Sequence, residues 1–144
     1  MKIYENKLMT INTPFKNIAV IGAGTMGSGI AGQIANSEQE VLLLDIQGET
    51  PNSITENAVK KLIKSDPPAL MHKTKKKLIK IGNIEDDFNK LADCDLIIEA
   101  VVERLDIKKN LYKRINEVVN ENCIITSNTS TIPIKLLVKI CQEH

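Results

Sequence analysis

The stretch VIGAGTMGSGIA, residues 20–31, decides the fold of this 144-residue sequence, because it contains the pattern GxGxxG at Gly22, Gly24 and Gly27. An apolar run typical of a buried strand comes directly before the motif, and a helical pattern over Thr25–Ser37 begins within it. The three glycines alone are weak evidence for any function. A strand, a glycine loop and a helix in this order are typical of the loop that binds a dinucleotide in α/β proteins.

Each glycine has its own steric role in that interpretation. Gly22 permits the tight turn, Gly24 lets the backbone approach a pyrophosphate, and Gly27 lets the helix pack against the strand. The free amides at the helix start, around Thr25 and Met26, then face the negative phosphates. The alternative interpretation is a glycine-rich turn that binds no ligand.

A carboxylate follows the second predicted strand, Val41–Leu44, at Asp45. It lies 18 residues beyond Gly27 (45 − 27), and an acidic residue that binds the adenosine ribose is expected about 20 residues on. A carboxylate there repels a 2′-phosphate, and the next two residues, Ile46 and Gln47, carry no positive charge that would accept one. The sequence therefore favours NAD over NADP, although Asp45 also suits a turn or a helix cap.

Strand-like and helical patterns continue to alternate along the chain. The predicted strands are Asn17–Ile21, Val41–Leu44, Leu78–Ile81, Asp95–Ala100 and Cys123–Ser127, and the helices are Thr25–Ser37, Ser53–Lys64, Ala69–Lys77, Asp86–Leu91, Ile107–Asn120 and Pro133–Gln142. This alternation predicts an α/β fold, a Rossmann-like doubly wound parallel sheet with helices on both faces and a helical excursion after the second strand. We expect an N-terminal extension over residues 1–16 and the nucleotide-binding domain over residues 17–144.

Composition excludes several classes of function. Lys and Arg number 19 and Asp and Glu 18, and the chain has no Trp, so neither a basic surface nor an aromatic platform for nucleic acid is expected. No apolar run approaches the roughly 20 residues of a membrane span. Cys94, Cys123 and Cys141 lack the spacing of a disulfide framework or a metal site, which predicts a cytoplasmic protein with no metal.

Two polar clusters follow the later strands, EAVVE at Glu99–Glu103 and SNTST at Ser127–Thr131. Ligands of doubly wound sheets bind outside the carboxyl ends of the strands. Small residues such as Ala100 and Val101 would contact a cofactor there without crowding it. The second cluster equally suits a helix N-cap before Pro133.

Taken together, VIGAGTMGSGIA, LLLD, DCDLIIEAVVERLDIKK and SNTST resemble the NAD domain of 3-hydroxyacyl-CoA dehydrogenases, from about Asn17 to about Leu137. The stretches GNIEDD and PPALMH resemble the bacterial multifunctional type, in which the dehydrogenase is fused to an enoyl-CoA hydratase module. The resemblance implies NAD as cofactor and an acyl-CoA as substrate in fatty-acid β-oxidation. In that reaction an L-3-hydroxyacyl-CoA is oxidised to a 3-ketoacyl-CoA and the hydride passes to NAD.

The resemblance also implies residue roles. Glu103 and Lys108 match positions that contact the nicotinamide-ribose end of the cofactor, and Asn128 matches a cofactor-side asparagine. Ser130 matches the serine that hydrogen-bonds the 3-oxygen of the substrate. The glycine motif and Asp45 would hold the pyrophosphate and the adenosine ribose.

The base of the family is a histidine in an HFFNP-like motif, oriented by a later glutamate. These residues and an all-helical dimerising domain follow the SNTS segment, and the sequence ends 14 residues after Ser130 (144 − 130). We therefore expect this chain alone to bind NAD without turnover, and the full-length enzyme to be an oligomer.

Three questions stay open at this point. The basic stretch Lys73–Lys80 suits either contact with coenzyme A phosphates or an ordinary solvated face. The chain also fits another dehydrogenase of the β-hydroxyacid type. A module that binds a dinucleotide without catalysis is the third possibility.

Overall fold

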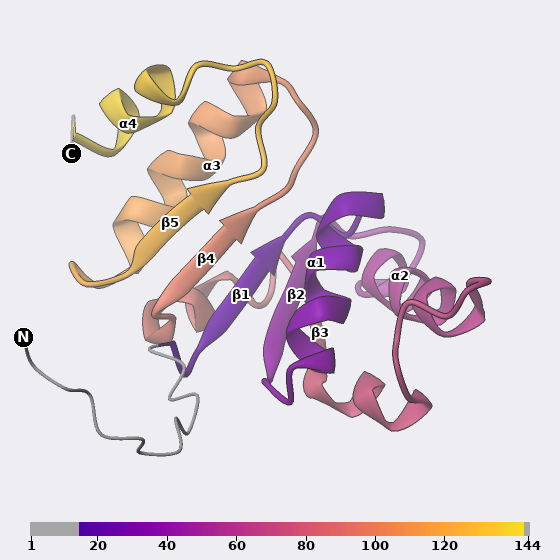
Figure 1. Ribbon diagram of the computed structural model, residues 1–144. Helices are drawn as coiled ribbons and strands as arrows, with labels where there is room; N and C mark the ends of the chain where they lie inside the picture. Colours follow the sequence, from indigo (N-terminus) through magenta and orange to yellow (C-terminus); the bar gives the residue numbers. More distant parts are fainter. Residues whose placement is uncertain (1–14, 143–144) are drawn as a thin grey trace, which may run out of the picture.

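The computed structural model describes residues 15–142, which form one five-stranded, all-parallel sheet in the order β3-β2-β1-β4-β5 (Figure 1). In chain order, the elements are β1 (Ile18–Ile21), α1 (Thr25–Asn36), β2 (Val41–Asp45), α2 (Ser53–Lys64), η1 (Lys73–Leu78), β3 (Ile79–Asn83), η2 (Phe88–Asp93), β4 (Leu96–Glu99), α3 (Leu105–Val118), β5 (Ile124–Ser127) and α4 (Ile134–Gln142). This strand order is that of the doubly wound Rossmann fold, as the sequence predicts.

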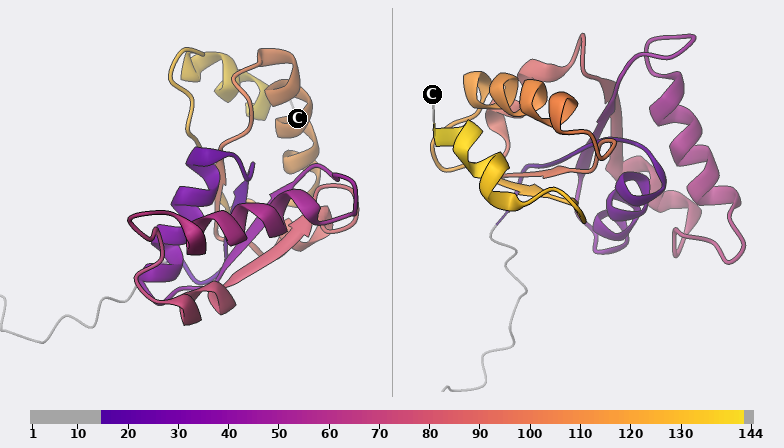
Figure 2. Two further views of the ribbon diagram at one scale, coloured as in Figure 1. Left: turned by 90° about the vertical axis from the view of Figure 1, so that its right-hand side faces the viewer. Right: turned by 90° about the horizontal axis from the view of Figure 1, so that it is seen from above.

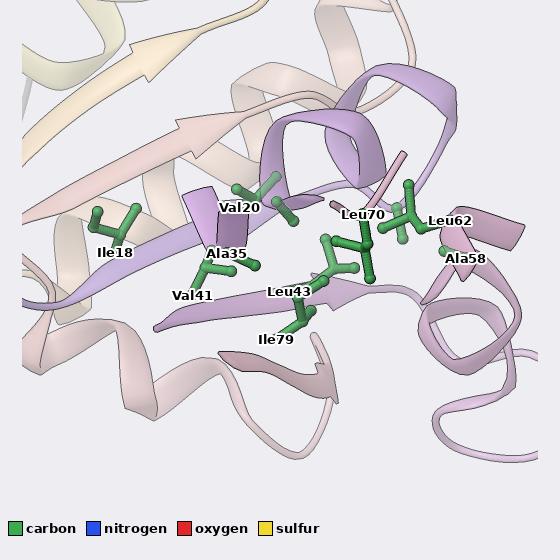
Figure 3. Close-up of a cluster of buried hydrophobic side chains, with 11 residues drawn as sticks. Ile18, Val20, Ala35, Val41, Leu43, Ala58, Leu62, Leu70 and Ile79 are labelled. Carbon is green, nitrogen blue, oxygen red and sulfur yellow. The ribbon is translucent and has the colours of Figure 1, made fainter. Parts of the chain in front are cut away.

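Helices cover both faces of the sheet because the central strands are apolar on both sides. Alternate residues of β1 point to opposite faces, so that Ile18 and Val20 pack with α1 and α2, whereas Ala19 and Ile21 pack with α3. Figure 2 shows α1 and α3 on opposite sides of the sheet. Figure 3 shows the cluster on the α1 and α2 side of the sheet, in which Leu43 lies near Leu62 and Leu70 of the helical excursion.

The order of the strands creates a switch point between β1 and β4. The chain leaves β1 toward β2 and β3 on one side, and returns to place β4 and then β5 on the other. Ile21, the last residue of β1, pairs with Leu44 of β2 on one side and with Glu99, the last residue of β4, on the other. Open α/β sheets bind ligands at such a point, in the crevice outside the carboxyl ends of the strands.

Two predicted helices are wrong in their bounds and type. The segment predicted as a helix over Ala69–Lys77 begins with bends, and only the 3-10 helix η1 follows. The reason is that the side chain of Asn36 binds the backbone of this segment, accepting from the Met71 amide at 3.0 Å and donating to the Ala69 carbonyl at 3.0 Å. These bonds tie the segment to α1 in place of a helix.

The helix predicted over Asp86–Leu91 is also replaced, by the 3-10 helix η2 that starts at Phe88. Here Asn83 intervenes, since its side-chain oxygen accepts from the amides of Glu85 and Asp86 at 3.1 and 2.8 Å. The first residues of the predicted helix are thereby held in a turn. Within the described residues, none of the helices has the length and apolar character to cross a membrane.

Candidate functional site

A cavity of about 430 Å³ lies at the carboxyl ends of β1, β2 and β4. It is lined by five residues that the sequence singles out and by a mostly apolar wall. The five are Gly22, Gly24, Asp45, Ala100 and Val101. The wall comprises Ile46, Ile84, Val102, Ile107 and Leu111, with Glu85, Asn110 and Arg114 as its polar members. A larger hollow of about 620 Å³ is at the other edge, beside Ile18, Val41 and Ile79, which begin their strands. The position of the 430 Å³ cavity makes it the candidate ligand site.

The glycine loop fits this cavity because two of its glycines are required by the fold and the third is free. Gly22 has a φ of 107°, and a Cβ on it would lie 2.4 Å from the carbonyl oxygen of Ala100. A Cβ on Gly27 would lie 1.8 Å from the carbonyl oxygen of Gly22. A Cβ on Gly24 would meet nothing within 4 Å. Packing within the protein therefore does not require a glycine at Gly24, which lines the cavity with bare backbone.

The start of α1 offers unsatisfied donors beside that loop. Gly24 is the N-cap, it makes no side-chain cap, and the first turn of α1 holds no acidic residue. Thr25 and Met26 are exposed, and Gly27 is buried. The first amides of a helix point outward along its axis and carry a partial positive charge, which favours an anion such as a phosphate.

Asp45 reaches from the end of β2 to the glycine loop. Its Oδ2 accepts a hydrogen bond from the Ala23 amide at 2.5 Å, and its Oδ1 accepts one from the Ile46 amide at 2.7 Å. A carboxylate has about four lone-pair sites, so two of them stay available. The half-buried side chain lines the cavity with that acceptor capacity, which two adjacent sugar hydroxyls would match.

The other predicted site residues form a second group at the ends of β4 and β5. Glu103 holds the loop 129–132, because its Oε1 accepts from the Thr129 hydroxyl at 2.5 Å and from the amides of Ser130, Thr131 and Ile132 at 3.0–3.2 Å. These bonds, the Thr129 hydroxyl first, hold the pKa of the Glu103 carboxyl far below its usual range. Ser130, with its hydroxyl, and Asn128, with its amide, are both exposed after β5.

Lys108 lies inside the protein, although the resemblance implies contact with the cofactor. Its side chain is completely buried, and its Nζ lies 2.9 Å from Oε2 of Glu99 and 3.0 Å from Oε2 of Glu103. Glu99, to which the sequence analysis gives no role, is completely buried as well. The signal that was available is helical spacing, since Lys108 shares the buried face of α3 with Leu111, Tyr112 and Ile115.

The basic stretch lies away from the cavity. η1 leads directly into the first residue of β3, at the edge of the sheet opposite the cavity. Two of its lysines pair with acidic residues that follow α1, Lys75 with Glu38 and Lys80 with Glu40 at 3.4 Å. These contacts favour a solvated, structurally paired surface over a coenzyme A site.

No group of three or more His, Cys, Asp or Glu side chains in the described range is arranged to hold a metal ion. The cavity and its donors instead suit a nucleotide, and the sheet, the glycine loop and the strand-end carboxylate together define a dinucleotide-binding Rossmann domain.

Comparison with known proteins identifies the family. The family model for the NAD-binding domain of 3-hydroxyacyl-CoA dehydrogenase matches residues 17–144, and the chain belongs to this family. NAD is accordingly its cofactor.

The related proteins are much longer than this chain. A putative fatty acid oxidation complex trifunctional enzyme of Rickettsia felis is 49% identical over 125 residues, covering 85% of this chain and 17% of the relative. A probable 3-hydroxyacyl-CoA dehydrogenase of Deinococcus radiodurans is 42% identical over 127 residues, covering 86% and 37%. The crystal structure of (S)-3-hydroxybutyryl-CoA dehydrogenase from Ralstonia eutropha superposes with a TM-score of 0.70 at 31% identity, covering 88% of this chain and 45% of that one. The chain thus spans less than half the length of each of these three proteins.

Proposed function

We propose that the chain holds NAD across the switch point, with the adenosine half in the 430 Å³ cavity and the nicotinamide half over β4 and β5. The single observation that carries this assignment is the meeting of Gly22, Gly24 and Asp45 in one cavity. The amides of Thr25, Met26 and Gly27 would bind the pyrophosphate, and Asp45 would accept from the ribose hydroxyls. Ala100 and Val101 would contact the middle of the cofactor.

The rest of the predicted site follows the path of the dinucleotide. A cofactor that crosses from β2 toward β5 brings its nicotinamide ribose to the loops after β4 and β5. Glu103, Lys108 and Asn128 belong to that end. In our proposal Lys108 acts through Glu103, because its ammonium is already paired inside the protein.

Titration with NADH and NADPH tests the cofactor assignment. We expect the chain to bind NADH at least tenfold more tightly than NADPH, since a 2′-phosphate meets the Asp45 carboxylate and a tenfold ratio corresponds to about 1.4 kcal/mol. Asp45→Asn removes this charge. We expect the variant to bind NADH more weakly and to discriminate less between NADH and NADPH. Equal affinities for both cofactors in the parent chain would overturn the assignment.

The whole protein, in this proposal, oxidises L-3-hydroxyacyl-CoA to 3-ketoacyl-CoA in fatty-acid oxidation. When bound, NAD supplies the acceptor for the hydride. Ser130, exposed in the loop that Glu103 holds, would donate a hydrogen bond from its hydroxyl to the 3-oxygen of the substrate. The trifunctional relatives support a hydratase module in the same polypeptide, and a cytoplasmic oligomer is part of the same proposal. Oxidation of NADH by acetoacetyl-CoA in the full-length protein tests this activity.

A further inference from the structure

Glu99 is the point at which three parts of the site meet. It ends β4, and its carboxylate is completely buried. Its Oε1 accepts from the Val101 amide at 2.8 Å, in the loop that lines the cavity. Its Oε2 accepts from the Ser127 hydroxyl at 2.6 Å, at the end of β5. Tyr112 of α3 donates to the same oxygen at 3.5 Å.

Lys108 extends these contacts to the loop after β5. An ammonium has three protons, and Nζ of Lys108 lies 3.0 and 2.9 Å from the two oxygens of Glu99 and 3.0 Å from Oε2 of Glu103. The other oxygen of Glu103 binds the loop 129–132. A continuous chain of charged hydrogen bonds therefore runs from the end of β4, through the interior, to the segment that carries Ser130.

Stability alone does not require such an arrangement. Removing the Glu99 carboxylate and the Lys108 ammonium from water is costly, and well-packed apolar side chains in the same volume often stabilise a protein equally well. Charged hydrogen bonds fix direction and distance more strictly than apolar contacts do. The network joins the loops after β4 and β5, the two loops over which the nicotinamide half lies in the proposed function.

We propose that Glu99 is a positioning residue for the nicotinamide half of the cofactor, acting through Lys108 and Glu103. This inference rests on the proposed function. It concerns one half of the ligand, because Lys108 and Glu103 connect Glu99 to the loop 129–132. The contact of Glu99 with the cavity wall is a hydrogen bond from the Val101 amide, which the side-chain oxygen of Glu99→Gln can still accept.

The test compares NADH with ADP-ribose, which lacks the nicotinamide, by calorimetric titration of the parent chain and of Glu99→Gln. Glutamine keeps the volume of the side chain and removes its charge. We expect the dissociation constant for NADH to rise about tenfold, as for the loss of a hydrogen bond to a charged group, and that for ADP-ribose to stay within about twofold. The matched control is Glu121→Gln, at an exposed position after α3, which should change neither constant.

Equal weakening of both ligands, or no weakening of either, would overturn the role of Glu99 while the proposed function stands. A parent chain that binds neither ligand would instead refute the proposed function, and the inference with it. Should Glu99→Gln not fold, the variant Glu99→Met with Lys108→Met leaves neither buried charge in place and is held to the same expectation. Its NADH affinity must fall while its ADP-ribose affinity is kept.

Discussion

The two halves of the sheet are built in opposite ways at the edge where we propose that the dinucleotide binds. On the β1–β2 side the site consists of bare backbone and one carboxylate, with Gly24 open and Asp45 at the rim. On the β4–β5 side it depends on a buried network of charges around Lys108. In the proposed site, the first half depends on open backbone and the Asp45 carboxylate. The second half depends on side chains from β4, α3 and the following loops that the fold brings together. Substitutions in the two halves should therefore have different effects on stability and on ligand binding.

The largest effect is expected where an added methyl group meets backbone. Gly27→Ala places a Cβ 1.8 Å from the carbonyl oxygen of Gly22. The position of Gly22 is itself fixed by a positive φ and by the hydrogen bond that its amide donates to the Leu44 carbonyl at 2.7 Å. We expect a loss of more than about 3 kcal/mol in the free energy of unfolding, at the upper end of overpacking effects. Urea denaturation followed by circular dichroism measures this loss.

Gly29→Ala is the matched control in the same helix. A Cβ there meets nothing within 4 Å, and alanine is favoured over glycine inside a helix by about 0.5–1 kcal/mol. This variant should be at least as stable as the parent chain. Equal destabilisation of both variants would show that the glycines serve the helix as a whole, and that the first half is not set by a single close approach.

A smaller effect, on binding alone, is expected from Gly24→Ala. The added methyl group meets no protein atom within 4 Å, so the unfolding midpoint should stay unchanged. It lies at the N-cap of α1, where we propose that the pyrophosphate binds. The methyl group should lower the NADH affinity about tenfold or more, because hydrogen bonds to the charged pyrophosphate are lost. Calorimetric titration with NADH and with ADP-ribose checks it. Both ligands contain the pyrophosphate, so unlike Glu99→Gln this variant must weaken both.

The difference between the halves also explains what could be predicted from the sequence. The strands, α1 and the position of Gly22 and Asp45 in one cavity follow from local pattern and fixed spacing, because the steric requirements of a loop restrict the residues within it. The buried network has no comparable motif, since it joins Glu99 to Ser127 twenty-eight positions on and Glu103 to Ser130 twenty-seven positions on. A glutamate at the end of a strand and a lysine in a helix look ordinary until the fold brings them together.

The two helix errors have the same origin. Asn36 and Asn83 are polar side chains whose partners lie elsewhere in the fold or in the turn beside them, and each competes with the helix that the apolar pattern favours. Lys108 shows that a polar residue with distant partners can sometimes be recognised in the sequence. Its place on the apolar face of α3 marks it as buried, and a buried lysine requires a carboxylate nearby.

The smallest effect concerns the pH dependence of the second half. The Thr129 hydroxyl and the amides of loop 129–132 lower the pKa of Glu103 from its ordinary value of 4.5 in the folded state. A lowered pKa stabilises the fold at pH values above 4.5, where the carboxyl is ionised in both states. This contribution is lost as the pH falls below 4.5, because the unfolded chain then takes up the proton more readily.

Glu103→Gln should therefore lower the midpoint of thermal unfolding at pH 7 by a few degrees at most. The gap between the midpoints of the variant and the parent chain should narrow between pH 4.5 and pH 3. Asp87, Asp95 and Asp106 also have lowered pKa values and destabilise both proteins in acid, so the gap between the two proteins isolates Glu103. Thermal unfolding at several pH values measures it. A gap that stays constant down to pH 3 would mean that the carboxylate does not hold the loop, and that the second half is organised by packing, as the first half is by its glycines.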